Sequence, residues 1–358
     1  MSKILVKIIF MILFSLAMIG GQKKIICDYC AKKITAKYFL TGKNSYHNIC
    51  YEKSVQIKCG HCHKKILKDY VTYENINYHN ICYEKFIQLK CDFCFLVIEN
   101  SYSFEKDKKY HKKCFVNNIL DKCDICLKPL EGKFIVDYWD NKYHEKHQIE
   151  MPVCDSCSRI VSQELTGGGY LINKKRSICS LCIRMVVNKK NQIPNLSEEV
   201  RNSLELNGLI NLPKVVPISL VDSKNELIKL SKNKLGDIKG YTHYNKTTLG
   251  GVTIKEDFHI YILSNLHSTA FKAVLAHEYL HVYLFMNNYY LNSDITEGFC
   301  NLGSQLIFQN IDTELSKYYL KSMYQNNDPD YGKGFIKMNS ILERTGWKKL
   351  LDELMYIN

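Results

Sequence analysis

Hydrophobic positions in the C-terminal half of the chain follow two different periods. The apolar stretch VLAHEYLHVYLF, residues 274–285, contains no Gly or Pro, which predicts a buried α-helix. From residue 268 onward the pattern stays helical, with breaks near 292 and at 328–334. Upstream, KVVPISLV predicts a strand, SKNELIKLSK a short helix, and GGVTIKEDFHIYIL two β segments around a turn at 256–257. We therefore expect a small sheet followed by helices.

The N-terminus has a different hydrophobic pattern. Lys3 and Lys7 precede an apolar run from Ile8 to Ile19, in which Ser15 is the one polar residue, and the run ends at Gly20 and Gly21. A run of this length is short for a membrane span but typical of a signal peptide. Residues 1–21 are thus expected to be a signal peptide or an uncleaved N-terminal anchor. The expected location is secreted, periplasmic or membrane-anchored rather than cytoplasmic.

A repeat of Cys and His occupies the region between these two parts. CxxC pairs begin at Cys27, Cys59, Cys91 and Cys123, each 32 residues after the last, and a fifth begins at Cys154. Each pair is followed by HxxC, HxxH or CxxC. The resulting sets of four are Cys27, Cys30, His47 and Cys50; Cys59, Cys62, His79 and Cys82; Cys91, Cys94, His111 and Cys114; Cys123, Cys126, His144 and His147; and Cys154, Cys157, Cys179 and Cys182.

These sets have the composition of structural zinc sites. Zinc binds four N or S ligands in a tetrahedron, and a two-residue gap lets one turn offer two ligands to the same ion. A disulfide framework is the alternative for sixteen Cys, but it does not explain why His fills the third position four times. We expect about five structural Zn²⁺ ions: three Cys₃His sites, one Cys₂His₂ and one Cys₄. Cys300 is left over and is expected to be a buried thiol.

The net charge bears on possible partners. The chain has a formal charge of +13, but Lys is spread along its whole length with no concentrated run. This distribution is typical of solvated surface, so we expect no nucleic-acid binding.

The apolar stretch 274–285 carries the motif HExxH at His277, Glu278 and His281. Residues four apart lie on one face of a helix, so both imidazoles can bind one catalytic Zn²⁺. Glu278 would then take a proton from a zinc-bound water. The alternative is a core helix with two ordinary histidines. FHIYIL, just before this helix, is expected to pair with an extended substrate.

A gluzincin-type site also needs a carboxylate from the next helix, and Glu297 in SDITEGF is the expected third ligand. Asp294 and Glu314 are the fallback ligands. The alternative for Glu297 is a helix cap, because its spacing from Asp294 resembles a capping box. The possible transition-state donors are His259, His267 and Tyr331, which the sequence does not rank.

Several motifs carry a family resemblance. KCDIC, CDSC, VPISLVDS, TLGGVTIKE, LAHEYLHVYL, TEGFC and YGKGF occur in this order from about residue 91 onward. Together they resemble the DA-one family of plant LIM-domain zinc metallopeptidases that limit organ growth, and their bacterial relatives. The resemblance implies an endopeptidase that cleaves protein substrates, with a zincin-like (gluzincin) domain, and selects Glu297 through the glutamate-glycine pair of the family.

The chain also departs from that family. LIM domains join their two zinc sites through two residues, whereas eight residues separate Cys50 from Cys59. The modules are therefore LIM-like, and they are expected to bind a protein partner or substrate. The plant members carry ubiquitin-interacting helices that this sequence does not match. We therefore do not extend activation by ubiquitin from that family to this chain.

The expected organisation is an α+β chain of tandem β-hairpin zinc modules followed by a peptidase domain. The modules are placed at 22–54, 55–86, 87–118, 119–150 and 151–188, a linker at 189–213, and the peptidase domain at 214–358. The alternative function is a non-enzymatic adaptor with LIM-like modules and a degenerate peptidase domain.

Overall fold

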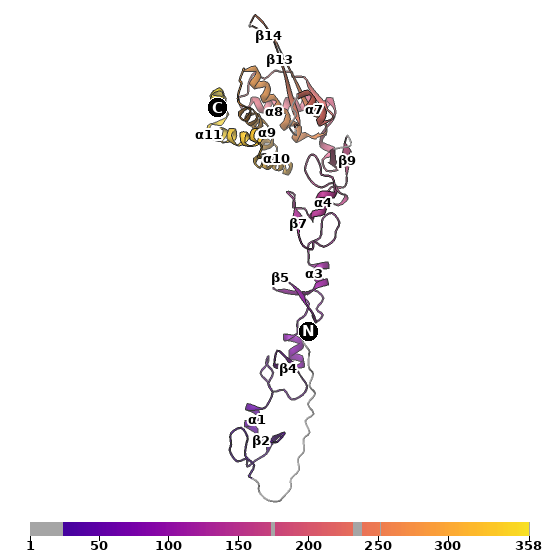
Figure 1. Cartoon of the computed structure of the whole chain (residues 1–358), viewed down its shortest axis with the longest axis vertical. Coiled ribbons are helices and arrows are strands. Elements are labelled where there is room, and N and C mark those ends of the chain that lie inside the picture. Colours follow the sequence, from indigo (N-terminus) through magenta and orange to yellow (C-terminus); the bar gives the residue numbers. More distant parts are fainter. Residues whose placement is uncertain (1–23, 173–175, 232–237, 251, 358) are drawn as a thin grey trace. The chain divides into compact units, whose positions relative to one another are not determined.

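The computed structural model describes residues 24–172, 176–231, 238–250 and 252–357 (Figure 1). The chain divides into two compact units between Leu120 and Asp121. The first unit holds three Cys/His modules, and the second holds the other two together with the C-terminal half. The predicted leader, 1–21, lies outside the described residues. No helix within the described ranges is long and apolar enough to cross a membrane.

Each of the first four modules is an antiparallel hairpin followed by a short helix. The elements are β1 (Tyr38–Thr41), β2 (Asn44–His47) and α1 (Asn48–Ser54); β3 (Tyr70–Tyr73), β4 (Ile76–His79), α2 (Asn80–Cys82) and the π-helix η1 (Tyr83–Ile87); β5 (Tyr102–Glu105), β6 (Lys108–His111) and α3 (Lys112–Asn118); β7 (Phe134–Val136), β8 (Lys142–His144) and α4 (Glu145–Glu150). Glu74 and Asn75 both have positive φ, as do Lys106 and Asp107. Such two-residue turns match the twist of the strands they join.

The core of a single module consists of very few side chains. In the second module, Cys59, Ile66 and Tyr78 are the buried members of the cluster, and in the third Cys91, Ile98 and Tyr110 take the same places. So small a core contributes little to stability, and a bound metal ion has to supply much of the folding free energy.

The fifth module has a different layout and leads directly into the C-terminal half. It contains α5 (Gln163–Thr166), the hairpin strands β9 (Gly169–Ile172) and β10 (Arg176–Cys179), and the 3₁₀ turn η2 (Ile183–Met185). The next strand, β11 (Val186–Val187), pairs with β15 (Leu266–His267). This pairing links the module to the residues just before the HExxH helix.

A three-stranded sheet precedes that helix, in the order β12-β14-β13. β12 (Ile218–Val221) is parallel to β14 (Val252–Leu263), and β13 (Gly240–Leu249) is antiparallel to it. The predicted turn at Glu256 and Asp257 is wrong, because both residues lie within β14 and the chain reverses between Leu249 and Val252. Glu256 stays in the strand, where its carboxylate accepts a hydrogen bond from Tyr244 Oη at 2.8 Å.

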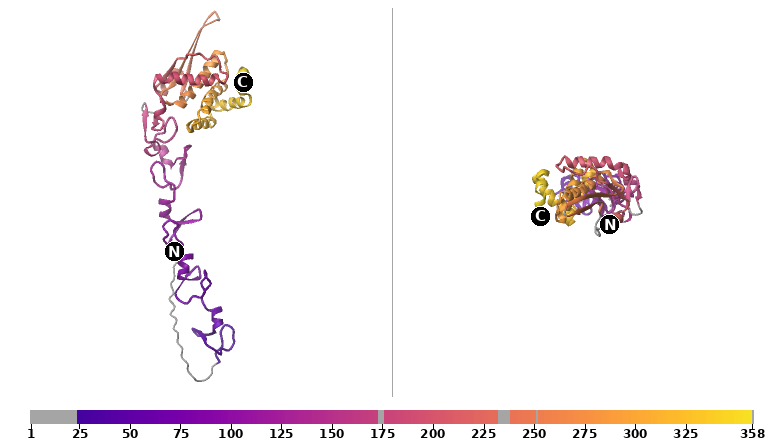
Figure 2. Two further views of the ribbon diagram at one scale, coloured as in Figure 1. Left: turned by 180° about the vertical axis from the view of Figure 1, so that it is seen from behind. Right: turned by 90° about the horizontal axis from the view of Figure 1, so that it is seen from above.

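Helices make up most of the remaining chain. They are η3 (Lys190–Gln192), α6 (Ile193–Glu205), α7 (Lys224–Ser231), α8 (Ser268–Met286), α9 (Ser293–Asn310), α10 (Glu314–Tyr324), the π-helix η4 (Pro329–Gly334), α11 (Phe335–Glu353) and η5 (Leu354–Tyr356). Helix α8 is buried on almost all sides, against the sheet and against α6 and α9. Figure 2 shows the same helices from behind and from above, with the β13–β14 hairpin extending away from them.

The range 189–213 was predicted as a linker, but it carries α6. Ile193, Val200 and Leu204 of this helix are buried in the main core. Pro194 lies in the first turn of this helix, where its missing N–H removes no helical hydrogen bond. The expected division between modules and C-terminal domain also differs from the structure, since the last two modules belong to the second compact unit.

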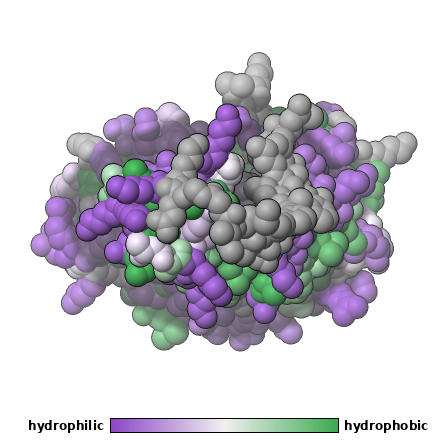
Figure 3. Space-filling view, turned by 90° about the horizontal axis from the view of Figure 1, so that it is seen from below, coloured by the Kyte–Doolittle hydropathy of each residue, from purple (hydrophilic) through white to green (hydrophobic). Residues whose placement is uncertain are grey.

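The surface of the molecule is mostly hydrophilic where Figure 3 shows it, with apolar side chains scattered among the polar ones. The first unit nevertheless exposes large apolar side chains on its modules. Leu40, Ile49, Leu67, Ile81, Phe95, Leu96 and Phe104 are each more than half exposed.

Candidate metal sites and the cavity between the helices

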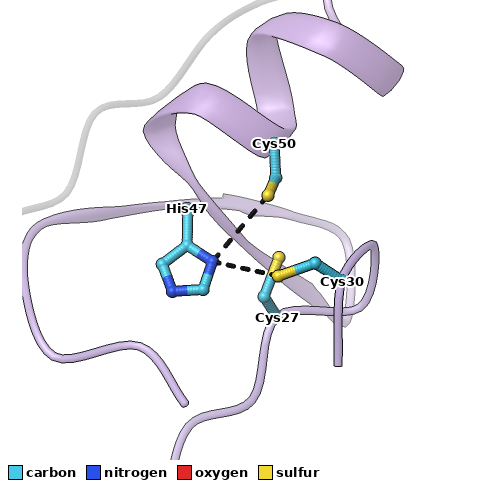
Figure 4. Close-up of side chains that lie close together, drawn as sticks. All are labelled: Cys27, Cys30, His47 and Cys50. Atoms are coloured by element: carbon cyan, nitrogen blue, oxygen red, sulfur yellow. Dashed lines mark hydrogen bonds between the residues drawn. The ribbon is translucent and has the colours of Figure 1, made fainter. Parts of the chain in front are cut away.

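The first module brings its four predicted ligands together, as Figure 4 shows. Cys27 and Cys30 lie on one turn, His47 ends β2, and Cys50 lies in the first turn of α1. The Nδ1 atom of His47 is 3.5 Å from Sγ of Cys30 and 3.8 Å from Sγ of Cys50. Around a tetrahedral Zn²⁺ with ordinary bond lengths, S and N ligands lie about 3.6 Å apart. The four side chains therefore fit zinc.

The other four predicted sets are brought together in the same way. In the second and third modules the His Nδ1 atom lies 3.3–3.9 Å from the neighbouring Sγ atoms. In the Cys₄ set, Sγ of Cys157 lies 3.8 Å from Sγ of Cys179, close to the ~3.8 Å between two thiolates on one zinc ion. All sixteen Cys are free thiols. The Cys/His clusters support about five structural metal sites.

A backbone carbonyl orients the first ligating His of each of the first four modules. The acceptor is the carbonyl oxygen three residues after the second Cys of each CxxC pair. It lies 2.9–3.2 Å from Nε2 of the His, which is His47, His79, His111 or His144. A proton on Nε2 makes this hydrogen bond and leaves the lone pair of Nδ1 for the metal. The tautomer that a zinc ligand needs is thus set by the fold.

Backbone N–H groups prepare the first Cys of a module for ionisation. Burial of Cys27 opposes ionisation, but the N–H groups of Cys30 and His47 outweigh it and lower the pKa of the thiol to about 6. The same balance lowers the pKa of Cys59 to about 5 and that of Cys91 to about 6. Thiolate is the form that binds metal, so the lowered pKa of these thiols favours binding of a metal cation at the turns.

The sets differ in how far their ligands are buried. In the first three sets only the first Cys is buried and the other three ligands are partly exposed, whereas all four ligands of the Cys₄ set are buried. The Cys₄ site therefore lies within the packed part of the second unit.

A sixth group of ligand atoms lies between α8 and α9. Nε2 of His277 is 3.2 Å from Nε2 of His281 and 3.2 Å from Oε2 of Glu297. Nε2 of His281 is 3.6 Å from the same Oε2. N and O ligands of a tetrahedral zinc lie about 3.3 Å from one another. Oε2 of Glu297 is buried without a well-formed hydrogen bond. Three polar atoms that converge without satisfying one another fit a metal ion.

Electrostatics at this group agree with a cation site. Burial would raise the pKa of Glu297, but the two imidazoles beside it hold the pKa well below its usual range. Burial would lower the pKa of His277, whereas the carboxylates of Glu297 and Glu278 raise it. Each group favours a positive charge at the point where the three atoms meet.

Asn301 fixes the orientation of His277, a role that the sequence analysis missed. Its amide nitrogen donates to the carbonyl oxygen of Tyr331 at 2.7 Å, which leaves its side-chain oxygen 3.0 Å from Nδ1 of His277 as an acceptor. The proton of the imidazole is therefore on Nδ1 and the lone pair of Nε2 is free. Asn301 lies four residues after Glu297, so helical spacing was the available signal.

Glu278 lies on the neighbouring face of α8 and is held by the start of β13. Its Oε2 accepts a hydrogen bond from Thr242 Oγ1 at 2.7 Å. A Cβ at Gly240 would lie 2.4 Å from Oε1 of Glu278, so only Gly leaves space for the carboxylate there. Neither residue follows from the sequence pattern, because their position depends on how the sheet packs on the helix.

Two glycines let η4 approach α9. A Cβ at Gly298 would lie 2.3 Å from the carbonyl oxygen of Gly334, and a Cβ at Gly334 would lie 2.1 Å from that of Asp294. This close approach places the Tyr331 ring 6.1 Å from the ring of His277, with the two nearly parallel. Burial and the carboxylates of Glu297 and Glu278 raise the pKa of Tyr331, so its hydroxyl stays protonated and can donate.

The three atoms and Glu278 open onto a cavity of about 620 Å³. Its walls come from α8, α9, the first residues of β13, the end of α10 and η4. Besides the candidate ligands, it is lined by Val274, Ser304, Met323 and Tyr331.

The structure places the other candidate residues outside this group. Asp294 pairs with Lys337 and Glu314 with Lys317, both at the surface. Glu297 caps no helix, since the N-cap of α9 is Asn292. His259 stacks on Tyr261 within the sheet, and His267 caps α8. Cys300 is a buried thiol, as predicted.

Comparison with known proteins gives a distant relationship. The chain matches no model of a known protein family. It is 21% identical to Protein DA1-related 2 of Arabidopsis thaliana, across 61% of this chain and 52% of that protein. The chain thus spans about half the length of this curated relative. The similarity and the Cys/His clusters together support LIM-like zinc modules in a chain distantly related to that protein.

Proposed function

We propose that this chain is a zinc-dependent endopeptidase whose C-terminal half is a zincin-like (gluzincin) domain. The observation that carries the proposal is the convergence of His277, His281 and Glu297 on one point beside the Glu278 carboxylate, at the edge of a cavity. Three protein ligands facing a cavity are typical of catalytic zinc, because one position stays free for water. The element order, a small sheet followed by the HExxH helix and a helix with the third ligand, also supports it.

The residues have distinct roles in the proposed reaction. A zinc ion held by the three ligands would polarise the attacking water and the scissile carbonyl. Glu278 would take a proton from that water as the oxygen bonds to the carbonyl carbon, and would deliver it to the amine as the C–N bond breaks. Thr242 holds the carboxylate in place. Tyr331, protonated and beside His277, is positioned to donate to the oxyanion.

The substrate is proposed to lie along β13. The sequence analysis assigned this role to FHIYIL, but that segment belongs to β14, which is central and paired on both sides. β13 is one of the two edge strands of the described three-stranded sheet, and its residues Gly240, Tyr241 and Thr242 line the cavity. An extended peptide added to this edge would pass Glu278.

The LIM-like modules are proposed to bind a protein partner or the substrate itself. Their exposed apolar side chains, such as Leu40, Phe95 and Phe104, support this role because large exposed apolar groups are common at interfaces. Export, or anchoring through residues 1–21, remains part of the proposal.

The test compares Glu278→Gln with the wild-type chain in cleavage of a co-incubated unfolded protein. The variant should keep six zinc ions per chain and lose cleavage by about a thousandfold or more, because the proton acceptor is gone. Glu198→Gln, at an exposed position on α6, is the matched control and should cleave normally. Undiminished cleavage by Glu278→Gln would refute the mechanism. Five zinc ions and no cleavage by the wild type would favour the adaptor instead.

A further inference from the structure

The Cys₄ module is built into the start of the HExxH helix. The strand that begins four residues after the ligand Cys182 pairs Val186 with His267 and Val187 with Leu266. Helix α8 begins at the next residue, Ser268, and the first candidate zinc ligand of the cavity follows nine residues later. Val187 and Leu266 are both buried in the main core. The Cys₄ site and the helix that carries the HExxH motif are thus joined by one short, buried strand pair.

Arg176 forms a second connection between the same two parts. Its side chain is 6% exposed, and Nε donates to Oδ2 of Asp155 at 2.7 Å while Nη1 donates to the carbonyl oxygen of Ser264 at 2.8 Å. Asp155 follows the ligand Cys154, and Ser264 lies four residues before α8. A buried guanidinium is costly unless it is paired, so this bridge holds both ends in place.

Three of the other four modules also have an Asp after the first ligand Cys, but they use it differently, whereas the second module has Gly60 there. The carboxylates of Asp28, Asp92 and Asp124 each accept a backbone N–H of their own hairpin at 2.6 Å. In the fifth module the equivalent carboxylate pairs with Arg176, which reaches beyond the module. The same Asp thus takes part in a link with the C-terminal half because its partner is the side chain of Arg176.

The same zinc-binding turn also contacts α10, on the other side of the cavity. Tyr319 donates to the carbonyl oxygen of Ser156, and Tyr318 donates to Oγ of Ser158. These two serines flank the ligand Cys157. One turn further along α10, Met323 lines the cavity. The turn 154–158 therefore contacts α10 directly and is linked to the residues before α8 through Arg176.

We infer that the Cys₄ site positions the candidate active site, and that Arg176 is a positioning residue that transmits its geometry to α8. Zinc at the four thiols keeps the turn 154–158 and β10 in one arrangement. Through Arg176 and the β11–β15 pair, this arrangement fixes the start of α8 and hence His277 and His281. The inference rests on the proposed function for any effect on cleavage, but its effect on α8 and on metal binding does not require cleavage.

The first experiment measures hydrogen exchange in the peptide spanning 263–272 of the full chain. Arg176→Gln removes no zinc ligand, so all structural zinc should remain, while exchange in this peptide should become at least about tenfold faster because Ser264 loses its partner. Arg184→Gln, an exposed Arg in the same module, is the matched control and should match wild type. Arg176→Lys should restore part of the protection. Unchanged exchange in Arg176→Gln would overturn the inference, whatever the chain's zinc content or activity.

The second experiment measures release of the zinc held by the helices to a chelator. The kinetic phase that belongs to this ion is the one missing in His281→Ala. In Arg176→Gln it should be about tenfold faster, the lower end of the effect of residues that support metal ligands. An unchanged rate would overturn the inference. If Arg176→Gln does not fold, Asp155→Asn breaks the same bridge from the other side and replaces it in both experiments.

Discussion

The first and fifth Cys/His modules offer four candidate metal ligands on similar turns but differ in burial and in the contacts that their Asp residues make. In the first, three of four ligands are partly exposed and Asp28 bonds to its own hairpin. In the fifth, all four ligands are buried and Asp155 pairs with Arg176, which reaches Ser264. Ligand spacing therefore brings four candidate metal ligands together in both modules, whereas the residues between the ligands determine which other parts of the chain each module contacts.

The fourth module belongs with the fifth for a similar reason. Trp139 donates from Nε1 to the carbonyl oxygen of Cys157, and its ring packs against Tyr318 of α10 and under the guanidinium of Arg159. Through this one aromatic side chain the fourth module contacts both the fifth module and the helices.

Removal of one zinc ligand should give the largest contrast between the two kinds of module. Cys157→Ser should destabilise the second unit by several kcal/mol, since structural zinc supplies on the order of 10 kcal/mol to small sites. Cys30→Ser should lose one zinc ion and leave the melting of the second unit unchanged. Calorimetry with zinc analysis measures both. Equal loss of stability of the second unit in the two variants would remove the contrast.

Truncation of an aromatic residue should have the next largest effect. Trp139→Ala should lower the free energy of unfolding of the second unit by about 3 kcal/mol, because it loses packing, a cation–π contact and a hydrogen bond. Phe104→Ala in the third module should change stability by less than about 0.5 kcal/mol, since Phe104 is 59% exposed. Denaturant unfolding followed by fluorescence of the remaining Trp347 measures the first. A loss below about 1 kcal/mol for Trp139→Ala would contradict docking through this residue.

Neutralisation of the Asp that follows the first ligand Cys should destabilise the fifth module more than the third. Asp155→Asn should cost about 2 kcal/mol, because the buried Arg176 loses its charged partner. Asp92→Asn should cost less than about 1 kcal/mol, because Asn still accepts the N–H of Lys109 at an exposed site. Thermal unfolding of both variants with zinc bound gives the comparison. Equal costs would mean that Arg176 does not depend on this carboxylate.

The smallest predicted effect concerns pH and the sixth site. In zinc-free protein the pKa of Glu297 lies below its unfolded value of about 4.5, so the carboxylate stabilises the fold above that pH and the contribution is lost as the pH falls toward the folded value. At pH 7, Glu297→Gln should therefore be less stable by about 1 kcal/mol, and the difference should shrink below pH 4.5. If the stability difference between wild type and Glu297→Gln instead increased as the pH fell, Glu297 would not be stabilising the fold in its ionised form.

Local patterns were enough to predict the ligand sets, because CxxC and its partners lie within one module. HExxH needed only the helical period, and the choice of Glu297 also needed the family resemblance. Thr242 could not be predicted, since its contact with Glu278 depends on packing between sheet and helix. The docking of Trp139 onto Tyr318 joins residues far apart in sequence, so neither spacing nor composition indicates it.

The different burial of the thiolates also sets an order of oxidative damage. Oxidants react with accessible thiolates, and those of the first three sites are partly exposed while the four of the Cys₄ site are enclosed. Peroxide should therefore strip zinc from the first three modules before it reaches the thiolates of the Cys₄ site. In an oxidising environment the first three modules would lose their metal first, and the fifth module would keep its metal the longest.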